Sequence, residues 1–269
     1  MKSYGINKKT VLATKEEFHL EEFYNLGYTI IENGLSTSEL LVLKEELDKV
    51  YKIQEEELGR DNLDKINETN IVRIPLAYSD LFANLAAKEN FMYYVRKILG
   101  DFFVLHLQNG IINMPNEGHH QSSWHRDLPY QNWTSSEPLA CNVYYCLDDF
   151  NSQTGATHIL PFSHQFTSAP STQYMERHSI QVNAPAGSVI LFNSMLFHKA
   201  GFNSSTNIIR RGINHVYVKP IISQQINLPK FLNGKYSDNA FLSMLFGYNT
   251  TLANSVFEYR NLRLRKKYL

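Results

Sequence analysis

The sequence has few cysteines and no excess of charge of either sign. Of its 269 residues only Cys141 and Cys146 are cysteines, too few for a disulfide framework. Five residues apart in a strand-like run, they should lie on opposite faces as free thiols, as in a reducing compartment. Lys plus Arg and Asp plus Glu are both 26, so the formal net charge is zero. This balance argues against charge-driven binding to nucleic acid or to an anionic membrane.

Long apolar runs are also missing. No stretch approaches the ~18 consecutive apolar residues of a membrane-spanning helix. The first residues, MKSYGINKKTVLA, have no apolar core that could serve as a signal peptide. We therefore expect a cytoplasmic protein, and the sequence leaves its oligomeric state open.

Aromatic residues are abundant, with 16 Phe and 16 Tyr, and they favour a β-rich fold. Helical spacing and capping patterns predict helices over 14–26, 36–58, 83–99 and 237–269, with a polar loop over 59–70. Short apolar runs bounded by turn residues predict strands over 28–31, 102–113, 139–147, 189–192 and 213–218.

Helices come first and strands later, without βαβ alternation, which excludes a doubly wound fold and favours a sandwich or barrel. We expect one domain over residues 1–269. Residues 1–100 would be mainly helical, 101–220 would form the β core, and 221–269 would be a C-terminal helical part.

The segment Trp124-His125-Arg126-Asp127 carries the strongest chemical signal. On a strand, His125 and Asp127 point the same way and can offer an imidazole and a carboxylate to one metal ion. His198, just after an apolar run, is the best candidate for a third ligand. Two histidines and one carboxylate form the facial triad of non-haem Fe(II) oxygenases, which leaves coordination positions open.

Arg210 strengthens this interpretation, because it enters the strand over 213–218 twelve residues after His198. Its planar guanidinium can bind a carboxylate through two hydrogen bonds. A dicarboxylate bound to iron at one end and to this arginine at the other would be 2-oxoglutarate.

Together these segments resemble the phytanoyl-CoA dioxygenase (PhyH-like) family of Fe(II)/2-oxoglutarate oxygenases. The similar segments are WHRDLPY at 124–130, ACNVYYCLDDFNSQTGATHILPFSH at 140–164 and AGSVILFNSMLFHKAGFNSSTNIIRRGI at 186–213. The resemblance covers residues 100–220 well and the N-terminal helices only loosely.

This resemblance implies a mainly β fold with flanking helices, built on a double-stranded β-helix (a cupin-like jelly roll). It implies Fe(II) on His125, Asp127 and His198, and 2-oxoglutarate held by Arg210, which begins the family-like RRGI run at 210–213. Arg211 would then face away, although a shift of one residue would exchange the two arginines.

The implied reaction consumes O2 and 2-oxoglutarate, releases succinate and CO2, and hydroxylates a C–H bond of a small molecule. Related halogenases lack the carboxylate, so the presence of Asp127 favours hydroxylation over halogenation. Phe162 and Ser188 depart from family residues in turns outside the metal set. The alternative is a non-oxidative cupin-like protein that binds a metal or a carbohydrate, which would not need Arg210.

Two further polar residues are candidates for binding the cofactor. Gln108 lies 17 residues before His125. In some relatives a Gln in this position contacts 2-oxoglutarate. Gln108 can equally be a barrel residue whose hydrogen bonds are made to nearby groups. Asn142 should share an inward face with Tyr144 and needs a polar partner there, either cosubstrate or substrate. Tyr130 and Trp133 follow Asp127 and could wall a substrate site, or could be ordinary core or surface aromatics.

Overall fold

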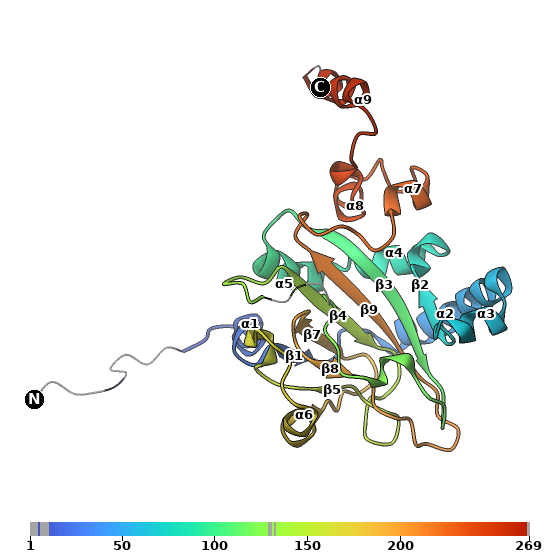
Figure 1. Cartoon of the computed structure of the whole chain (residues 1–269), viewed down its shortest axis with the longest axis vertical. Coiled ribbons are helices and arrows are strands. Elements are labelled where there is room, and N and C mark those ends of the chain that lie inside the picture. The colour runs from blue at the N-terminus through green and yellow to red at the C-terminus, as the bar shows by residue number, and fades with distance from the viewer. Residues whose placement is uncertain (1–4, 6–10, 129–130, 132, 268–269) are drawn as a thin grey trace, which may run out of the picture.

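The computed structural model describes residues 5, 11–128, 131 and 133–267. Its centre is an antiparallel sheet of six strands in the order β1-β7-β4-β9-β3-β2 (Figure 1). These strands are β1 (Tyr28–Ile31), β2 (Ile71–Arg73), β3 (Val104–Asn113), β4 (Ala140–Cys146), β7 (Val189–Asn193) and β9 (Arg210–Val218). A smaller sheet has the order β6-β5-β8, with β5 (His158–Ile159), β6 (Ile180–Gln181) and β8 (His198–Lys199).

Helices begin where capping residues satisfy their first backbone N–H groups. Thr14 and Glu17 form a capping box at α1 (Lys15–Leu26), and Ser36 and Glu39 form another at α2 (Thr37–Leu58). Gly27 ends α1 with a φ of 90°, a left-handed conformation that glycine adopts without strain. Both caps and both helices agree with the sequence patterns.

The large sheet has two buried faces. One face packs against helices: Leu47 of α2 lies in one cluster with Val143 and Tyr145 of β4 and with residues of α4 (Asp80–Ala86) and α5 (Glu89–Leu99). The other face, with Tyr144 and Cys146, packs against Ile159 of the smaller sheet. This arrangement confirms the predicted mainly β core with flanking helices.

The two cysteines lie on these two faces, as strand alternation predicts. Cys141 packs in the helix-facing cluster and Cys146 in the cluster between the sheets. Both side chains are fully buried and both are free thiols.

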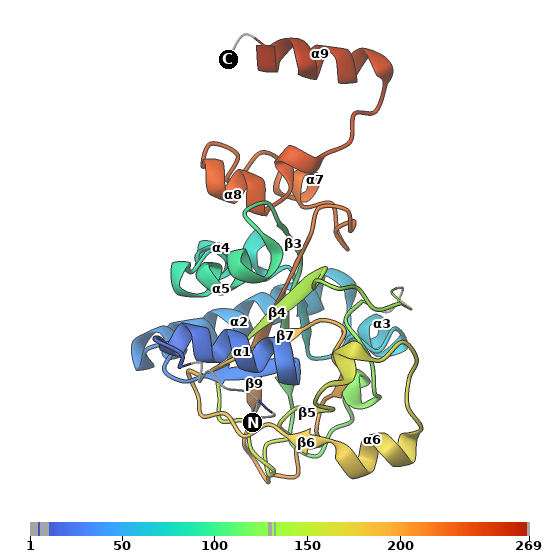
Figure 2. The same ribbon diagram turned by 90° about the vertical axis from the view of Figure 1, so that its left-hand side faces the viewer.

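The C-terminal part differs from the prediction of one helix over 237–269. It contains α7 (Leu228–Leu232), α8 (Ala240–Leu245), a 3-10 turn at Tyr248–Thr250 and α9 (Val256–Lys267). Figure 2 shows α9 set apart beyond α7 and α8. Gly247, with a φ of 87°, interrupts the helical pattern after α8.

Elsewhere the structure adds elements that the sequence patterns missed. The segment predicted as one helix over 83–99 is two helices, α4 and α5, and the predicted loop over 59–70 contains α3 (Arg60–Lys65). A short helix, α6 (Thr172–His178), and 3-10 turns at Pro75–Ala77, His120–Ser122 and Ser163–Gln165 complete the described elements. No helix in the described part of the chain has the length and apolarity required to cross a membrane.

The contact of α2 with the sheet generates a stability prediction. Leu47 is fully buried, whereas Leu41 on the same helix is 61% exposed. Leu47→Ala should lower the free energy of unfolding by about 2–5 kcal/mol, because it leaves a cavity under the sheet. Leu41→Ala should change it by less than about 0.5 kcal/mol. Equal urea midpoints for the two variants would contradict the packing of α2 described above.

Candidate metal centre and adjoining cavities

Three potential metal-ligand side chains converge at one end of the space between the sheets. Ligand atoms of His125, Asp127 and His198 all lie within 4.8 Å of one another. Asp127 Oδ1 is 3.7 Å from His125 Nε2 and 3.6 Å from His198 Nε2. The predicted triad is therefore brought together in space.

The backbone around the triad is not the regular strand that the sequence analysis expected. His125 forms an isolated antiparallel bridge with His198, in which each backbone N–H donates to the other residue's carbonyl at 3.0 Å. The backbone N–H of Asp127 donates to Ser194 O at 3.0 Å. These bonds tie the His125–Asp127 segment to the chain leading into β8.

Both imidazoles are oriented by a hydrogen bond at Nδ1. His125 Nδ1 lies 2.8 Å from Ser123 O and His198 Nδ1 lies 3.0 Å from Leu196 O. A carbonyl oxygen only accepts, so each Nδ1 carries a proton, and in the neutral form of each ring the lone pair lies on Nε2, on the side of Asp127. Burial, followed by the nearby His125, lowers the pKa of His198 to about 4. At neutral pH His198 is then the uncharged imidazole that a metal ion requires.

The Asp127 carboxylate is held by amides from the large sheet. Asn142 Nδ2 donates to Asp127 Oδ2, and Asn214 Nδ2 donates to the same oxygen at 3.3 Å. Asn142 is fully buried, and its Oδ1 accepts from Ser194 Oγ at 2.5 Å. Because the amides occupy Oδ2, Oδ1 remains on the side of the two histidines. Hydrogen bonds of this kind, made to the side of a carboxylate that faces away from a metal, commonly fix its orientation.

Asn142 faces inward as predicted, but its partners are protein side chains and not the cosubstrate or substrate expected for it. The structure places its amide against Asp127 and Asn214, so it orients the Asp127 carboxylate. Asn214 and Ser194, which complete these contacts, were not predicted from the sequence. Asn214 could have been found, because on β9 it shares the inward face of Arg210 by strand alternation.

Arg210 is the most unusual group near the triad. Its side chain is 1% exposed, and the guanidinium donates to Tyr144 Oη at 3.0 Å and to Gly155 O at 2.8 Å. It stacks on the Phe150 ring at 4.5 Å. Among the residues that the structure describes, no carboxylate forms an ion pair with it.

Arg210 and the histidines line one space, which we call the inner cavity. His125, His198, Arg210, Tyr144 and Thr157 belong to its wall, and its volume is about 20 Å³, which is room for about one water molecule. A buried guanidinium without a counter-charge is costly. The charge of its wall therefore favours an anionic group beside Arg210, and a ligand that reaches from Arg210 to the triad would have to displace side chains of the wall.

Arg211 faces the other side of the sheet. Its guanidinium forms ion pairs with Asp48 of α2 at 2.9 Å and with Asp148 at 3.1 Å. Strand alternation therefore puts Arg210, and not Arg211, into the inner cavity.

Gln108 requires a correction, because it does not line the inner cavity. Its Oε1 accepts from Leu76 N and its Nε2 donates to Phe82 O, both at 2.8 Å, and Nε2 also lies 2.7 Å from His215 Nε2. It faces the helices, and its neighbour Asn109 lines the side nearer the triad. Gln108 connects β3 to the helical layer, and its side chain lies outside the cofactor set.

A larger space, which we call the outer cavity, opens beside the triad. It has a volume of about 780 Å³, and His125 and Asp127 form part of its wall. Trp133 also lines it and is 52% exposed. Tyr130, the other predicted wall residue, lies outside the described residues.

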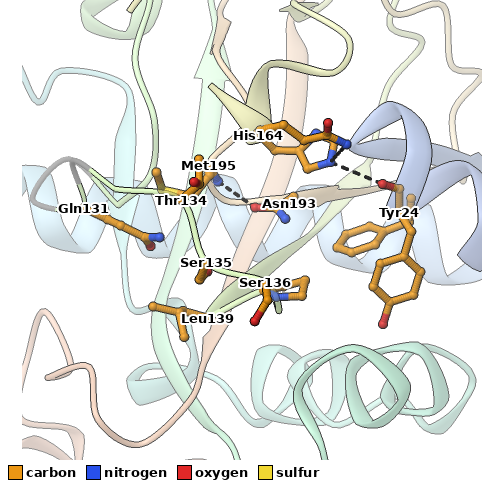
Figure 3. A pocket seen from close by; sticks show the side chains of 12 residues that line it. Tyr24, Gln131, Thr134, Ser135, Ser136, Leu139, His164, Asn193 and Met195 are labelled. Atoms are coloured by element: carbon orange, nitrogen blue, oxygen red, sulfur yellow. Dashed lines mark hydrogen bonds between the residues drawn. The ribbon is translucent and has the colours of Figure 1, made fainter. Parts of the chain in front are cut away.

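A third space of about 330 Å³ adjoins the outer cavity and shares Gln131 and Leu139 with it. Figure 3 shows Gln131 and Leu139 at one end of this side cavity and Tyr24 and His164 at the other. His164 Nε2 lies 3.3 Å from Tyr24 O. None of the three metal-ligand candidates lines the side cavity.

Comparison with known proteins gives three findings. Residues 23–212 match the family described as phytanoyl-CoA dioxygenase (PhyH). The Mycobacterium tuberculosis protein Rv1501 is 29% identical over 246 residues, which cover 87% of each chain. The non-heme alpha ketoglutarate dependent epimerase SnoN from nogalamycin biosynthesis has a TM-score of 0.60 at 17% identity, covering 76% of this chain and 81% of that chain.

SnoN has also been solved in complex with Fe3+, alpha ketoglutarate and nogalamycin RO. That structure has a TM-score of 0.58 at 18% identity, covering 76% of this chain and 84% of that chain. At these identities the likeness establishes the fold, and it agrees with the predicted double-stranded β-helix.

The amide contacts of Asp127 predict an effect on metal affinity. Asn142→Leu keeps the branched shape of the side chain but removes the donor to Asp127, so affinity for a divalent metal should fall by about 10- to 100-fold. Titration with Mn(II) measures this. Tyr145→Phe on the opposite face of β4 is the matched control and should bind the metal as the wild type does. Unchanged metal affinity in Asn142→Leu would mean that the amide does not orient Asp127.

The contacts of Gln108 predict an effect on stability alone. Gln108→Leu leaves Leu76 N–H and Phe82 C=O buried without their partner, which should cost about 2–4 kcal/mol of unfolding free energy. Its affinity for 2-oxoglutarate should match that of the wild type. A stable variant that has lost 2-oxoglutarate would instead restore Gln108 to the cofactor set.

Proposed function

The chain belongs to the phytanoyl-CoA dioxygenase family, and from that premise we propose that it is an Fe(II)- and 2-oxoglutarate-dependent oxygenase that hydroxylates a small molecule. Its metal ligands would be His125, Asp127 and His198. Its 2-oxoglutarate arginine would be Arg210.

One observation carries the proposal: the buried guanidinium of Arg210, which has no carboxylate partner among the described residues, lines the same cavity as two imidazoles of the triad. 2-Oxoglutarate has a carboxylate at each end and a keto group beside one of them. One end can chelate a metal on the triad while the other compensates the charge of Arg210. The donor set fits both groups, because the triad offers two imidazole nitrogens and a carboxylate, the combination typical of non-haem Fe(II).

Tyr144 would contact the same carboxylate of 2-oxoglutarate as Arg210. Burial raises the pKa of Tyr144 to about 12, so its hydroxyl stays protonated at neutral pH. Its oxygen already accepts from Arg210 Nη1, which leaves the O–H free to donate to a carboxylate. Arg210 and Tyr144 would then hold the distal carboxylate together, in a place from which bulk water is excluded.

When bound, iron and 2-oxoglutarate supply the oxidising chemistry with O2, and the cosubstrate leaves as succinate and CO2. The chain's own residues set the geometry. His125 and His198 are fixed through their Nδ1 bonds, and Asp127 is fixed through Asn142 and Asn214. The outer cavity lies against His125 and Asp127, so a substrate bound there would approach the metal from that side.

Hydroxylation is the outcome we propose. Asp127 keeps the carboxylate ligand, which disfavours halogenation, and its Oδ1 faces both histidines. SnoN, which shares the fold, is named as an epimerase, so the product must be identified by its mass. A gain of one oxygen atom supports hydroxylation, whereas an isomer of unchanged mass would replace it with epimerisation.

The alternative is a cupin-like protein that binds a metal or a carbohydrate without oxidation. The same architecture hosts such functions. A plain binding protein would have no use for a buried arginine without a counter-charge beside its metal ligands, so Arg210 favours the oxygenase.

The test compares the two neighbouring arginines of β9. Arg210→Leu should weaken 2-oxoglutarate binding to the anaerobic Fe(II)-loaded protein by about 100-fold, because the charged hydrogen bonds to the distal carboxylate are lost. Arg211→Leu removes the ion pairs to Asp48 and Asp148, so it should lower stability and leave 2-oxoglutarate affinity as in the wild type. Isothermal titration calorimetry measures the affinity, and succinate release measures turnover.

Three outcomes decide between the functions. Loss of 2-oxoglutarate binding in Arg210→Leu alone supports the oxygenase. Loss in Arg211→Leu alone would mean that the two arginines exchange roles. A wild-type protein that binds a divalent metal but neither binds 2-oxoglutarate nor forms succinate would favour the non-oxidative alternative.

A further inference from the structure

The bridge between His125 and His198 brings the residues on either side of it into two further opposed pairs. The two histidines exchange both backbone hydrogen bonds, at 3.0 Å each. In an antiparallel arrangement the residue pairs next to such a bridge make no backbone hydrogen bonds to each other, and their side chains approach closely. These pairs, which we call the flanking pairs, are Trp124 with Lys199 and Arg126 with Phe197.

Each flanking pair places a cation over an aromatic ring. Lys199 Nζ lies 4.9 Å from the centre of the Trp124 ring, and Arg126 Cζ lies 4.1 Å from the centre of the Phe197 ring. A cation within about 6 Å of a ring centre is attracted by the electron density of the ring face. The cation comes from one segment in the first pair and from the other segment in the second pair. Both attractions therefore draw the same two segments together.

The flanking pairs lie behind the imidazoles and outside the metal site. Successive side chains of an extended segment alternate, so these residues point away from the face that carries the metal-ligand candidates. Trp124 and Phe197 pack in one cluster with Leu160 and Met175. None of the four residues lines the inner cavity. They can act on the triad only through the backbone that carries it.

A carboxylate bridges the pair of Trp124 and Lys199. Glu176 Oε1, from α6, accepts from Trp124 Nε1 at 3.0 Å and from Lys199 Nζ at 2.7 Å. A single oxygen atom is thus bonded to the residue before His125 and to the residue after His198.

The 3-10 turn at Ser163–Gln165 bridges the pair of Arg126 and Phe197. Arg126 Nη2 donates to Ser163 O at 3.1 Å and to Phe166 O at 2.6 Å. The hydroxyl oxygen of Ser163 accepts from Phe197 N at 2.8 Å. Arg126 also borders the outer cavity, but these hydrogen bonds run to residues outside the wall of that cavity. The guanidinium therefore joins the triad segment to the turn and to the opposite ring.

The imidazoles need such support, because their own hydrogen bonds do not fix the distance between them. Each Nδ1 bonds to a carbonyl two residues earlier in its own segment. These carbonyls belong to Ser123 and Leu196, and the bonds orient each ring within its segment. Between the segments, β8 is only two residues long, and His125 pairs with it through an isolated bridge and not through a continuous ladder.

We propose, on the premise shared with the function above that the triad binds a divalent metal, that the flanking pairs are positioning residues for that metal. They hold the His125 segment against the His198 segment, so that both Nε2 atoms reach one ion together with Asp127. Their removal changes metal affinity through the spacing of the two imidazoles.

The sign of the change in metal affinity separates this role from a simple effect of charge. Lys199→Met keeps most of the side chain and removes a cation near the site. Less repulsion alone would strengthen the binding of a divalent cation or leave it unchanged. Loss of the positioning should instead weaken metal affinity about tenfold. Lys199→Arg keeps a cation over Trp124 and should bind the metal within about twofold of the wild type.

The measurement is a titration of the metal-free protein with Mn(II), in which electron paramagnetic resonance detects the free ion, together with urea unfolding of the metal-free protein. Lys235→Met is the matched control. Lys235 Nζ also lies over a ring, 4.8 Å from the centre of Tyr236, and pairs with Asp80 at 2.6 Å. Lys235 lines neither cavity beside the triad, so this control should bind Mn(II) as the wild type does.

A variant of the second pair gives an independent check. Arg126→Met removes the cation over Phe197 and should also weaken Mn(II) affinity about tenfold. The double variant with Lys199→Met should bind more weakly than either single variant. If Arg126→Met does not fold, because it also loses the hydrogen bonds to the turn, the lysine variants decide. The ion pair of Lys199 with Glu176 is partly exposed, and loss of such a pair costs little stability.

Three results would overturn the inference. One is unchanged or tighter Mn(II) binding by Lys199→Met, and another is a loss that Lys199→Arg does not restore. The third is a lower urea midpoint with wild-type metal affinity, which would give the pairs a structural role alone.

The two proposals also fail separately. A wild type that binds Mn(II) but not 2-oxoglutarate overturns only the oxygenase function. A wild type that binds 2-oxoglutarate and Mn(II) normally, beside a Lys199→Met variant with unchanged Mn(II) affinity, overturns only the role of the flanking pairs. A wild type that binds no divalent metal overturns both.

Discussion

The pairing of β9 with β3 on one side and β4 on the other fixes which side chains reach the metal site. β9 pairs with both neighbours over nearly its full length. A shift of its register by one residue would therefore exchange the side chains that lie on its two faces. Arg210 and Asn214 then point between the sheets, and Arg211 and His215 point to the helices. Every contact of the inner cavity with this strand depends on that register.

The two faces of the large sheet have different roles. The helix-facing side is closed by apolar packing, by the bonds of Gln108 to Leu76 and Phe82, and by the ion pairs of Arg211. The inward side carries the polar groups of the site: Arg210, Asn142 and Asn214. Substitutions on the two faces should therefore separate stability from ligand binding.

The parts of the fold that depend on a single local sequence pattern could be predicted from the sequence. The capping boxes of α1 and α2 and the long strands follow from spacing and composition. The triad was indicated by the His125-x-Asp127 spacing together with the family resemblance around His198, although the backbone that brings it together is irregular. Gln108 could not be placed in this way. It is adjacent to Asn109, both are polar, and a bulge between Leu105 and Leu107 interrupts the alternation of β3.

Other elements depend on contacts between distant segments. β5, β6 and β8 have two residues each, too few to show a period, and they exist because they pair with one another. Asn142 was expected to face inward, which it does, but its partner Asp127 arrives through an irregular segment that no periodicity describes. In both cases pairing across the fold, and not local preference, decides the structure.

The burial of Cys141 and Cys146 has a consequence for a protein proposed to handle iron and O2. Oxidation of a cysteine begins from the thiolate, and burial raises the pKa of both thiols well above its usual value. The two sulfur atoms remain protonated and out of reach of solvent oxidants in the folded state. Resistance to oxidative damage at cysteine is thus a by-product of the same close packing that builds the two faces of the sheet.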